Sequence, residues 1–264
     1  MENLLKNIIQ ISKDAGKEIL DVYNTTFHIE YKDDKSPLTE ADKRAHNRIE
    51  NGLRKISTFP IISEEGKNIS YQERKKWKYF WMVDPLDGTK EFIKKKGEFT
   101  VNIALIKENR PILGVVYAPA MDVLYYGGES LGAYKVENRK KVKIAVKKKS
   151  NNKITVVASK SHLNNETKSF IEKLRKHFNV DMTSVGSSLK ICLVAEGKAD
   201  IYPRLGPTME WDTAAAHAIL NAAGGKIIKY EDLPLEELKN LNEIEYNKSD
   251  LLNPYFIAMR PDVF

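Results

Sequence analysis

The stretch Tyr79-Phe-Trp-Met-Val-Asp-Pro-Leu-Asp-Gly-Thr-Lys-Glu-Phe92 determines how we interpret the whole sequence. Its apolar, β-rich beginning predicts a buried strand that ends at Asp84. Pro85 then fixes a φ angle, and Gly88 permits a tight reversal that opens a helical turn. Asp84 and Asp87 can converge around this reversal, and the free N–H groups of the turn would face an anion.

Three further acidic segments lie at the ends of predicted elements. They are Thr39-Glu-Ala-Asp42 and Glu210-Trp-Asp-Thr213, which each open a helix, and Ser63-Glu-Glu65, which ends a strand. Each also has an ordinary structural explanation. Thr39 and Asp42 have the spacing of a capping box, Asp212 fits an N-cap, and the glutamates can be solvated. Taken one at a time, these segments favour the structural explanation.

Acidic groups at several element ends nevertheless suggest one shared cleft that contains Glu64, Asp84, Asp87 and Asp212. Two carboxylates at ~4 Å repel each other by ~4 kcal/mol at an effective dielectric constant near ~20. The cluster would therefore spread apart or take up protons unless cations filled it. Carboxylates, together with the Leu86 carbonyl oxygen, favour Mg²⁺ over zinc or copper.

Composition limits the other classes of protein. The chain has 264 residues, 42% hydrophobic and 30% charged, which fits a folded protein. One cysteine, Cys192, excludes a disulfide framework, and no His-x-x-x-His pair supports a zinc hydrolase. No stretch reaches the ~18 apolar residues of a membrane span, and the first residues do not resemble a signal peptide. We therefore expect a cytoplasmic protein without a transmembrane segment.

The net charge is +7, from 43 Lys and Arg against 36 Asp and Glu. Nucleic acid, an anionic membrane surface, an anionic small molecule or a lysine-rich solvated surface would each suit it. Basic residues concentrate in residues 135–149 and 74–78 with few aromatics among them, and no nucleic-acid-binding module is visible. We expect an anionic small-molecule substrate and no nucleic acid. Peripheral attachment to the cytoplasmic face of a membrane and the oligomeric state stay open.

Apolar periodicity predicts an alternating arrangement of helices and strands. Helices are expected at residues 2–23, 39–56, 165–178, 188–196 and 213–223. Strands are expected at residues 60–63, 79–84, 99–106, 112–118, 123–126, 154–159, 181–185, 199–202 and 255–259. We interpret residues 135–150 as an exposed hairpin or connection, and residues 231–245 as a surface excursion. This pattern indicates a layered α/β architecture, with a seam near residue 149.

Eight short motifs carry a resemblance to a known family. Three of them are Ser63-Glu64-Glu65, Asp84-Pro-Leu-Asp-Gly-Thr89 and Trp211-Asp212. The others are Asp87-Gly-Thr-Lys-Glu-Phe-Ile93, Gly97-Glu-Phe-Thr-Val-Asn-Ile-Ala104, Ser159-Lys-Ser-His162, Val185-Gly-Ser-Ser-Leu-Lys190 and Gly206-Pro-Thr208. The first three resemble the signatures of the inositol monophosphatase superfamily. The others resemble its branch of CysQ-type 3′(2′),5′-bisphosphate nucleotidases.

The resemblance implies an α+β fold, a layered αβαβα sandwich, formed by one phosphatase domain of residues 1–264. Its two packed subdomains would span about residues 1–149 and 150–264. It also implies a Mg-dependent phosphomonoesterase that hydrolyses adenosine 3′,5′-bisphosphate to AMP and phosphate in sulfur assimilation. The 5′-phosphosulfate form would be a second substrate. Two or three Mg²⁺ ions per site and inhibition by lithium belong to the same expectation.

The roles of individual residues follow from the same resemblance. The implied metal ligands are Glu64, Asp84, the Leu86 carbonyl, Asp87 and Asp212. Asp42 and Thr89 match the pair that orients and deprotonates the attacking water. The backbone of Gly88 and Thr89 matches the phosphate cradle, and the implied substrate contacts also include Glu64, Leu86, Asp87 and Asp212. Contacts near the ribose, the 5′-phosphate and the base are His162, Ser187, Ser188 and Lys190.

Two other functions remain to be compared with this one. An inositol- or sugar-phosphate phosphatase could use the same scaffold, although Lys190 and the continuation Lys90-Glu91-Phe92 argue against it. A basic nucleic-acid-binding protein is the alternative from a different class. Phosphate release from the two types of substrate, with Mg²⁺ and with added Li⁺, would distinguish the two enzymes.

Overall fold

The computed structural model describes residues 1–31, 37–148, 152–158 and 164–264. The helices are α1 (Glu2–Tyr23), α2 (Glu40–Ile56), α3 (Tyr71–Arg74), α4 (Thr89–Ile93), α5 (Asn165–Arg175), α6 (Leu189–Ala195), α7 (Glu210–Ala222) and α8 (Leu235–Leu238). The strands are β1 (Ile29–Tyr31), β2 (Pro37–Thr39), β3 (Ile61–Ser63), β4 (Tyr79–Asp87), β5 (Thr100–Lys107), β6 (Arg110–Ala118), β7 (Val123–Gly128), β8 (Gly132–Glu137), β9 (Lys140–Ile144), β10 (Lys153–Val157), β11 (Asn179–Thr183), β12 (Ile201–Arg204), β13 (Lys226–Lys229) and β14 (Phe256–Met259). The seam expected near residue 149 lies outside the described residues, and the division into subdomains stays a prediction.

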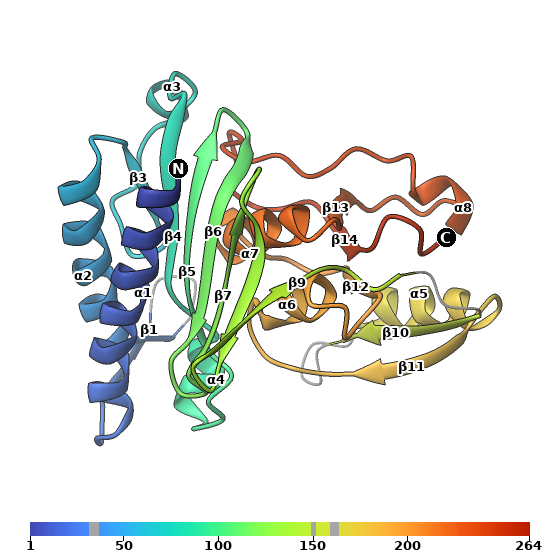
Figure 1. The fold of residues 1–264 in the computed structure, drawn as a ribbon, viewed down its shortest axis with the longest axis horizontal. Helices are drawn as coiled ribbons and strands as arrows, with labels where there is room; N and C mark the ends of the chain where they lie inside the picture. The colour runs from blue at the N-terminus through green and yellow to red at the C-terminus, as the bar shows by residue number, and fades with distance from the viewer. Residues whose placement is uncertain (32–36, 149–151, 159–163) are drawn as a thin grey trace.

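The strands form two main sheets (Figure 1). The first has the order β3-β4-β5-β6-β7-β8-β9 and is antiparallel except for the parallel pair β3 and β4. The second has the order β11-β10-β12-β14-β13. In it β10 runs parallel to both β11 and β12, whereas β14 is antiparallel to β12 and β13. A small antiparallel sheet pairs β1 with β2.

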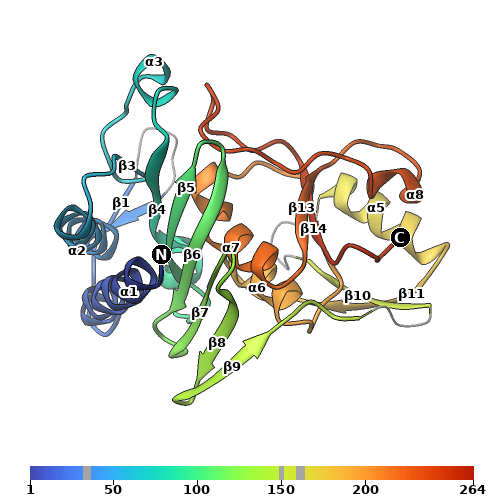
Figure 2. The same cartoon turned by 45° about the horizontal axis from the view of Figure 1, so that its top comes forward.

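Five layers stack across the molecule (Figures 1 and 2). Helices α1 and α2 cover the outer face of the first sheet, α6 and α7 lie between the two sheets, and α5 with the short α8 covers the far face of the second. Successive side chains of β4 point to opposite faces of the first sheet and so pack into two different hydrophobic clusters. Phe80 and Met82 pack between the sheets, whereas Trp81 and Val83 pack toward α1 and α2. The expected α+β fold, a layered αβαβα sandwich, is confirmed.

Helix α7 packs closely against β6 because that strand carries Gly114. A Cβ atom at Gly114 would lie 2.0 Å from the carbonyl oxygen of Ala215, so a larger residue would push the helix away from the sheet. Ala214 and Ala218 are also buried in this contact region and keep the helix face narrow. The packing directs the first turn of α7 toward the end of β4, where the acidic residues meet.

Three features differ from the sequence-based expectation. Helix α7 begins at Glu210 rather than Thr213, so Met209 is the N-cap and Asp212 lies in the first turn. Asp212 is therefore not the N-cap. Strand β13 was not predicted and follows Gly225 directly. The expected surface excursion at 231–245 includes α8, whose two leucines are buried.

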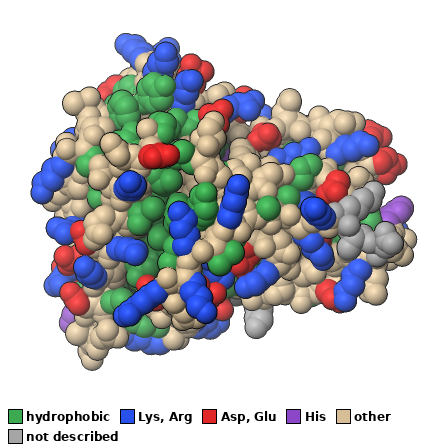
Figure 3. Space-filling view, in the orientation of Figure 1, with side chains coloured by type: hydrophobic (Ala, Val, Ile, Leu, Met, Phe, Trp, Pro, Cys, Tyr) green, Lys and Arg blue, Asp and Glu red, His purple; other side chains and the backbone are tan. Residues whose placement is uncertain are grey.

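The basic stretch forms the hairpin of β8 and β9, as expected, but it is not fully exposed. Lys135 is buried and pairs with Glu137 and Glu196, each at 3.1 Å, and Lys147 pairs with Asp200 at 3.2 Å. On the face shown in Figure 3, Lys and Arg side chains are dispersed over the surface. The engaged lysines reduce the support for a nucleic-acid-binding function.

Among the helices that the structure describes, none combines the length and the apolarity needed to cross a bilayer. The expectations of a cytoplasmic location and of peripheral attachment stay predictions.

Candidate active site

The end of β4 and the start of α4 form one side of the candidate site. Strands β4 and β5 pair as far as Asp84 and again at Asp87, with an irregularity between these two residues. Within it, Asp84 Oδ1 accepts a hydrogen bond from the Leu86 N–H at 3.0 Å. Gly88 adopts a φ of +90°, which favours glycine, and α4 starts at the next residue. The reversal predicted from Pro85 and Gly88 is present.

Asp84, Asp87 and Asp212 bring their carboxylates together at this point. One carboxylate oxygen from each residue lies within 4.8 Å of the others. Burial raises the pKa of Asp84 well above its ordinary value, and the charges of Glu64 and Asp87 raise it further. The pKa of Asp212 is raised by burial first and by Asp87 next. A bound cation would offset the mutual repulsion of these carboxylates, so the cluster is suited to a divalent metal ion.

Asp87 is held in place by the turn that precedes α6. Its Oδ2 accepts hydrogen bonds from the Ser187 hydroxyl at 2.7 Å, the Ser188 N–H at 2.6 Å and the Ser188 hydroxyl at 2.7 Å. Ser187 has a φ of +58°, and its hydroxyl also lies 2.6 Å from that of Thr100. Three donors on one oxygen fix the plane of the Asp87 carboxylate.

The other two aspartates also use one oxygen for the fold. Asp212 Oδ2 accepts a hydrogen bond from the Met209 N–H at 2.8 Å, and Asp84 Oδ1 accepts the Leu86 bond. Among the described residues, none donates a hydrogen bond to the second oxygen of Asp84, Asp87 or Asp212. Each carboxylate is therefore oriented by one oxygen and can offer the other to a metal ion.

Asp42 and Thr89 lie next to each other beside the carboxylate cluster. Asp42 lies in the first turn of α2, where its Oδ2 accepts hydrogen bonds from the Thr39 N–H at 2.7 Å and the Thr39 hydroxyl at 2.6 Å. Its Oδ1 lies 3.5 Å from the Thr89 hydroxyl oxygen, which is also 3.2 Å from the Leu86 carbonyl. Burial raises the pKa of Asp42 to about 6. A buried carboxylate beside a hydroxyl can act as a general base through it.

Glu64 approaches the cluster from β3. Its N–H donates to the Val83 carbonyl at 3.2 Å, which places it beside the end of β4. Its charge contributes to the raised pKa of Asp84. The three carboxylates that lie within 4.8 Å of one another do not include it. Glu64 therefore belongs to the cleft at a greater distance than the three aspartates.

A cleft of about 360 Å³ contains the carboxylate cluster and Thr89, whereas Asp42 does not line it. Its lining includes Glu64, Asp84, Leu86, Asp87, Gly88, Thr89 and Asp212. These seven are all the residues that the resemblance implies as metal ligands or as part of the phosphate cradle. The structure thus brings together segments from β3, β4, α4 and α7, which lie far apart along the chain.

A second pocket of about 160 Å³ adjoins the cleft and shares Asp87 and Asp212 with it. Its lining includes three cationic residues, Lys96, Lys190 of α6 and Arg204 at the end of β12, together with Glu91 and Glu98. Lys190 Nζ lies 5.8 Å from the ring centre of Tyr202, and burial lowers the pKa of Lys190. Arg204 Nη2 donates to a carbonyl at 2.9 Å, but its buried Nε has no partner among the described residues. The pocket can therefore accept an anion.

The sequence identified part of this pocket. Lys190 lines it as expected, and Ser187 and Ser188 line it while bonding to Asp87. His162 lies outside the described residues. Arg204 was missed, although an arginine that directly follows the β-rich run Ile201-Tyr-Pro could have drawn attention to the end of that strand.

Cys192, Trp211, His46 and His217 line neither the cleft nor the adjoining pocket. Cys192 is a free, fully buried thiol in the core, and Trp211 packs against the same core while half-buried. His46 and His217 lie on α2 and α7. The candidate active site therefore consists of the carboxylate cluster and the adjoining pocket.

Comparisons with known proteins agree with this geometry. A model of the inositol monophosphatase family matches residues 1–255. The chain is 46% identical over 236 residues to the 3′(2′),5′-bisphosphate nucleotidase CysQ of Salmonella typhimurium, covering 88% of this chain and 93% of that protein. It is 36% identical over 274 residues to the protein of the same name from Haemophilus influenzae, covering 100% and 95%.

A solved structure extends the comparison to three dimensions. The crystal structure of CysQ from Bacteroides thetaiotaomicron, a bacterial member of the inositol monophosphatase family, is similar with a TM-score of 0.87 and 43% identity. The match covers 99% of this chain and 98% of that one. The family match also includes each segment that contributes a carboxylate to the cleft. This chain therefore belongs to the inositol monophosphatase family, whose members depend on metal ions.

Proposed function

We propose that this protein is a Mg²⁺-dependent 3′(2′),5′-bisphosphate nucleotidase that hydrolyses adenosine 3′,5′-bisphosphate to AMP and phosphate. Sequence relatives that carry this name support the proposal at 46% identity over most of the chain. The observation that carries it is the pair of adjoining sites, a carboxylate cluster and a pocket with Lys190 and Arg204. A substrate with two separate phosphate groups needs both.

The donor set supports Mg²⁺ as the metal. Asp84, Asp87 and Asp212 would hold it, with Glu64 and the Leu86 carbonyl as further oxygen ligands. Oxygen donors without histidine or cysteine favour a hard cation. When bound, Mg²⁺ supplies Lewis-acid polarisation of the phosphoryl oxygens and a lowered pKa of coordinated water.

The chain's own groups account for proton transfer. In the proposed step Asp42 Oδ1 takes the proton of the Thr89 hydroxyl, and the Thr89 oxygen takes a proton from the attacking water. The water oxygen forms a bond to phosphorus as the bond to the 3′-oxygen breaks. The leaving 3′-oxygen takes a proton from a solvent water, and Asp42 later returns its proton to solvent. Ionised Asp42 is required at the start, and the Leu86 carbonyl contact directs the Thr89 side chain.

Lys190 and Arg204 bind the 5′-phosphate in this proposal. Both line the pocket beside the cluster, and an anion would compensate the buried charge of Lys190 and supply a partner for Arg204 Nε. The 5′-phosphosulfate form would place its own anionic group in the same pocket. Inositol monophosphate has no second phosphate, so it would leave both cations without a partner.

A comparison of substrates tests the proposal. We expect adenosine 3′,5′-bisphosphate to be hydrolysed with a kcat/KM at least about 100-fold above that for inositol 1-phosphate, because charge-assisted bonds to the second phosphate contribute ~3 kcal/mol. Lys190→Ala should raise KM for the bisphosphate more than it lowers kcat. On adenosine 3′-monophosphate, which lacks the 5′-phosphate, it should have little effect. Lys176→Ala, on the exposed end of α5, is the matched control. Faster hydrolysis of inositol 1-phosphate would instead support the sugar-phosphate alternative.

A further inference from the structure

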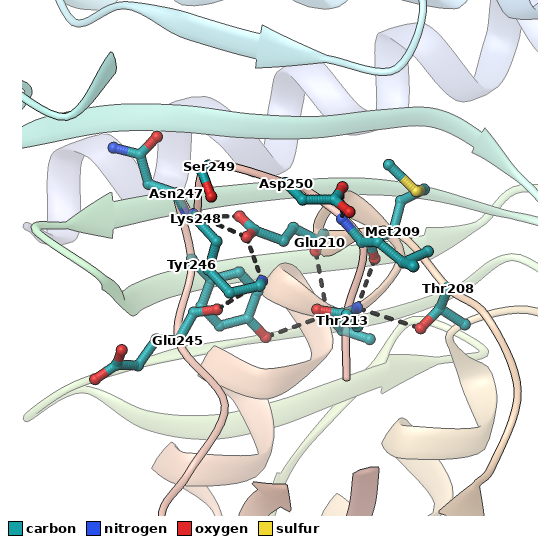
Figure 4. Close-up of polar contacts among 12 residues, drawn as sticks. Thr208, Met209, Glu210, Thr213, Glu245, Tyr246, Asn247, Lys248, Ser249 and Asp250 are labelled. Atoms are coloured by element: carbon teal, nitrogen blue, oxygen red, sulfur yellow. Dashed lines mark hydrogen bonds and ion pairs between the residues drawn. The ribbon is translucent and has the colours of Figure 1, made fainter. Parts of the chain in front are cut away.

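Residues 246–253, which we call the strap, cross the first turn of α7 (Figure 4). The strap runs antiparallel to residues 208–210. The Asn253 N–H donates to the Thr208 carbonyl at 2.8 Å, and the Glu210 N–H donates to the Leu251 carbonyl at 2.9 Å. The Asn253 side-chain amide also donates to the Met209 carbonyl at 2.7 Å. These bonds attach the strap to the start of the helix that carries Asp212.

Glu210 anchors the strap through its side chain. The Glu210 carboxylate is fully buried, and it accepts hydrogen bonds from the Asn247 N–H at 2.5 Å and the Lys248 N–H at 3.1 Å. The Lys248 ammonium forms an ion pair with the same carboxylate. Figure 4 shows these contacts converging on Glu210 from one side. Glu210 lines neither the cleft nor the adjoining pocket, so its carboxylate serves the strap and not a ligand.

Arg74 connects the strap to the short helix α3. Its buried guanidinium donates to Asn247 Oδ1 at 2.7 Å, the Lys248 carbonyl at 3.1 Å and the Ser249 carbonyl at 3.3 Å. The Asn247 side chain returns a bond to the Arg74 carbonyl at 2.8 Å. Arg74 ends α3, which follows β3 and Glu64 in the chain. A continuous set of hydrogen bonds therefore runs from Arg74 through the strap to Glu210.

Asp212 follows Glu210 by one intervening residue and has its own carboxylate fixed by the Met209 N–H. The strap holds the backbone of residues 208–210, which includes this donor, from outside the cleft. A shift of that backbone would move Asp212 relative to Asp84 and Asp87. Partners that orient metal ligands commonly change metal affinity by 10- to 100-fold.

We propose that Glu210 is a positioning residue for the metal site. Through the strap and Arg74, it sets the position of Asp212 relative to the carboxylates at the end of β4. The inference rests on the metal-dependent function proposed above, but it requires no particular organic substrate. It assigns Glu210 no contact with substrate or metal.

Glu210→Gln is the variant that tests this role, because it keeps the shape of the side chain and removes its charge. We expect Mn²⁺, used as a paramagnetic probe without nucleotide, to bind about 10-fold or more weakly when free Mn²⁺ is followed by electron paramagnetic resonance. The Mg²⁺ concentration for half-maximal activity should rise by a similar factor, and high Mg²⁺ should restore most of kcat. KM for the nucleotide at saturating Mg²⁺ should change less than twofold.

Asp200→Asn is the matched control. Asp200 is also fully buried, and it pairs with Arg260 at 2.7 Å and Lys147 at 3.2 Å, but it lies outside both lining sets. Both variants should lower the melting temperature, whereas Glu210→Gln should weaken Mn²⁺ binding and Asp200→Asn should not. Equal Mn²⁺ affinity in Glu210→Gln and the wild type would overturn the proposal and leave Glu210 with a structural role alone.

Lys248→Met is a second variant in case Glu210→Gln does not fold. It removes one partner of Glu210 while both backbone N–H bonds remain, and we expect a smaller loss of Mn²⁺ affinity in the same direction. Unchanged affinity in this variant would also contradict the proposal. Because Mn²⁺ binding is measured without nucleotide, a wrong substrate assignment would leave this result intact.

Discussion

Helices α2 and α7 both begin with a capping aspartate, and the two aspartates differ in what their remaining carboxylate oxygen faces. In each, an aspartate in the first turn accepts a hydrogen bond from the N–H of the residue that caps the helix. Thr39 donates to Asp42 at 2.7 Å, and Met209 donates to Asp212 at 2.8 Å. The remaining oxygen of Asp42 faces Thr89, whereas that of Asp212 joins the carboxylate cluster. A carboxylate has two oxygens, so helix capping and catalysis are compatible roles for one residue.

The two helix starts differ in what supports them. At α2 the support is local, because the Thr39 hydroxyl bonds to Asp42 and accepts from the Ala41 N–H. At α7 the cap is Met209, which offers no hydroxyl, and the strap supplies the bonds instead. Short-range support can be recognised as a sequence pattern. Support from a segment more than 30 residues away requires the fold.

The largest expected effect comes from Asp212→Asn. This change should lower kcat by about 1,000-fold, because several kcal/mol of metal-dependent charge stabilisation are lost. Asp42→Asn, the same change at the matching position of α2, should lower kcat by about 100-fold through loss of the base. Direct titration with Mn²⁺ separates the two, since only Asp212→Asn should weaken binding substantially. Equal Mn²⁺ affinities in both variants would remove the functional difference between the helix starts.

The parts of the site that could be predicted are those built from neighbouring residues. The strand that ends at Asp84, the reversal at Gly88 and the capping pair Thr39 and Asp42 each depend on residues only a few positions apart. The convergence of distant carboxylates needed an electrostatic argument and the family resemblance as well. Lys190, which lines the adjoining pocket, was also identified only through the family resemblance.

Residues whose roles depend on distant partners were missed. Arg74 and Asn247 are 173 positions apart, and neither belongs to a recognisable motif. Glu210 reads as an ordinary acidic residue in a first helical turn until the strap is seen. The exposed character expected for Lys135 was wrong for the same reason, because its partner Glu196 lies on another element. Sequence patterns describe local geometry, whereas burial is set by segments that arrive from elsewhere.

A smaller effect than that of the two Asp→Asn variants is expected from a change of pH, and a pH profile of kcat/KM tests the role of Asp42. Because burial raises the pKa of Asp42 to about 6, its carboxyl should be protonated below that pH and unable to accept the Thr89 proton. The value of kcat/KM should then fall about tenfold per pH unit below about 6. Asp42→Asn should lack this limb in its residual activity. A wild-type profile that stays flat down to pH 5 would exclude Asp42 as the base.

The raised pKa of Asp42 affects stability in the direction opposite to its expected effect on activity: as the pH rises, activity should increase and the contribution of Asp42 to stability should decrease. The folded-state pKa lies above the unfolded value of 3.8, so the folded protein binds more protons between these two values. The contribution of Asp42 to stability is fully present below pH 3.8 and is lost as the pH rises through about 6. The ionised form of Asp42, which the proposed mechanism requires, is therefore the form that stabilises the fold less, unlike a carboxylate whose pKa is lowered by an ion pair.

The smallest expected effect is at the cap itself. Thr39→Ala removes the hydroxyl that donates to Asp42 and accepts from Ala41, and it should lower the free energy of unfolding by about 1 kcal/mol in urea titrations. Thr39→Ser keeps the hydroxyl and should lose less than half as much. Met209→Leu on α7 changes no cap hydroxyl, so its cost should come from packing alone. If Thr39→Ser were as destabilising as Thr39→Ala, the methyl group rather than the hydroxyl would support α2. The start of α2 would then not be stabilised by local hydrogen bonds, and its contrast with α7 would be wrong.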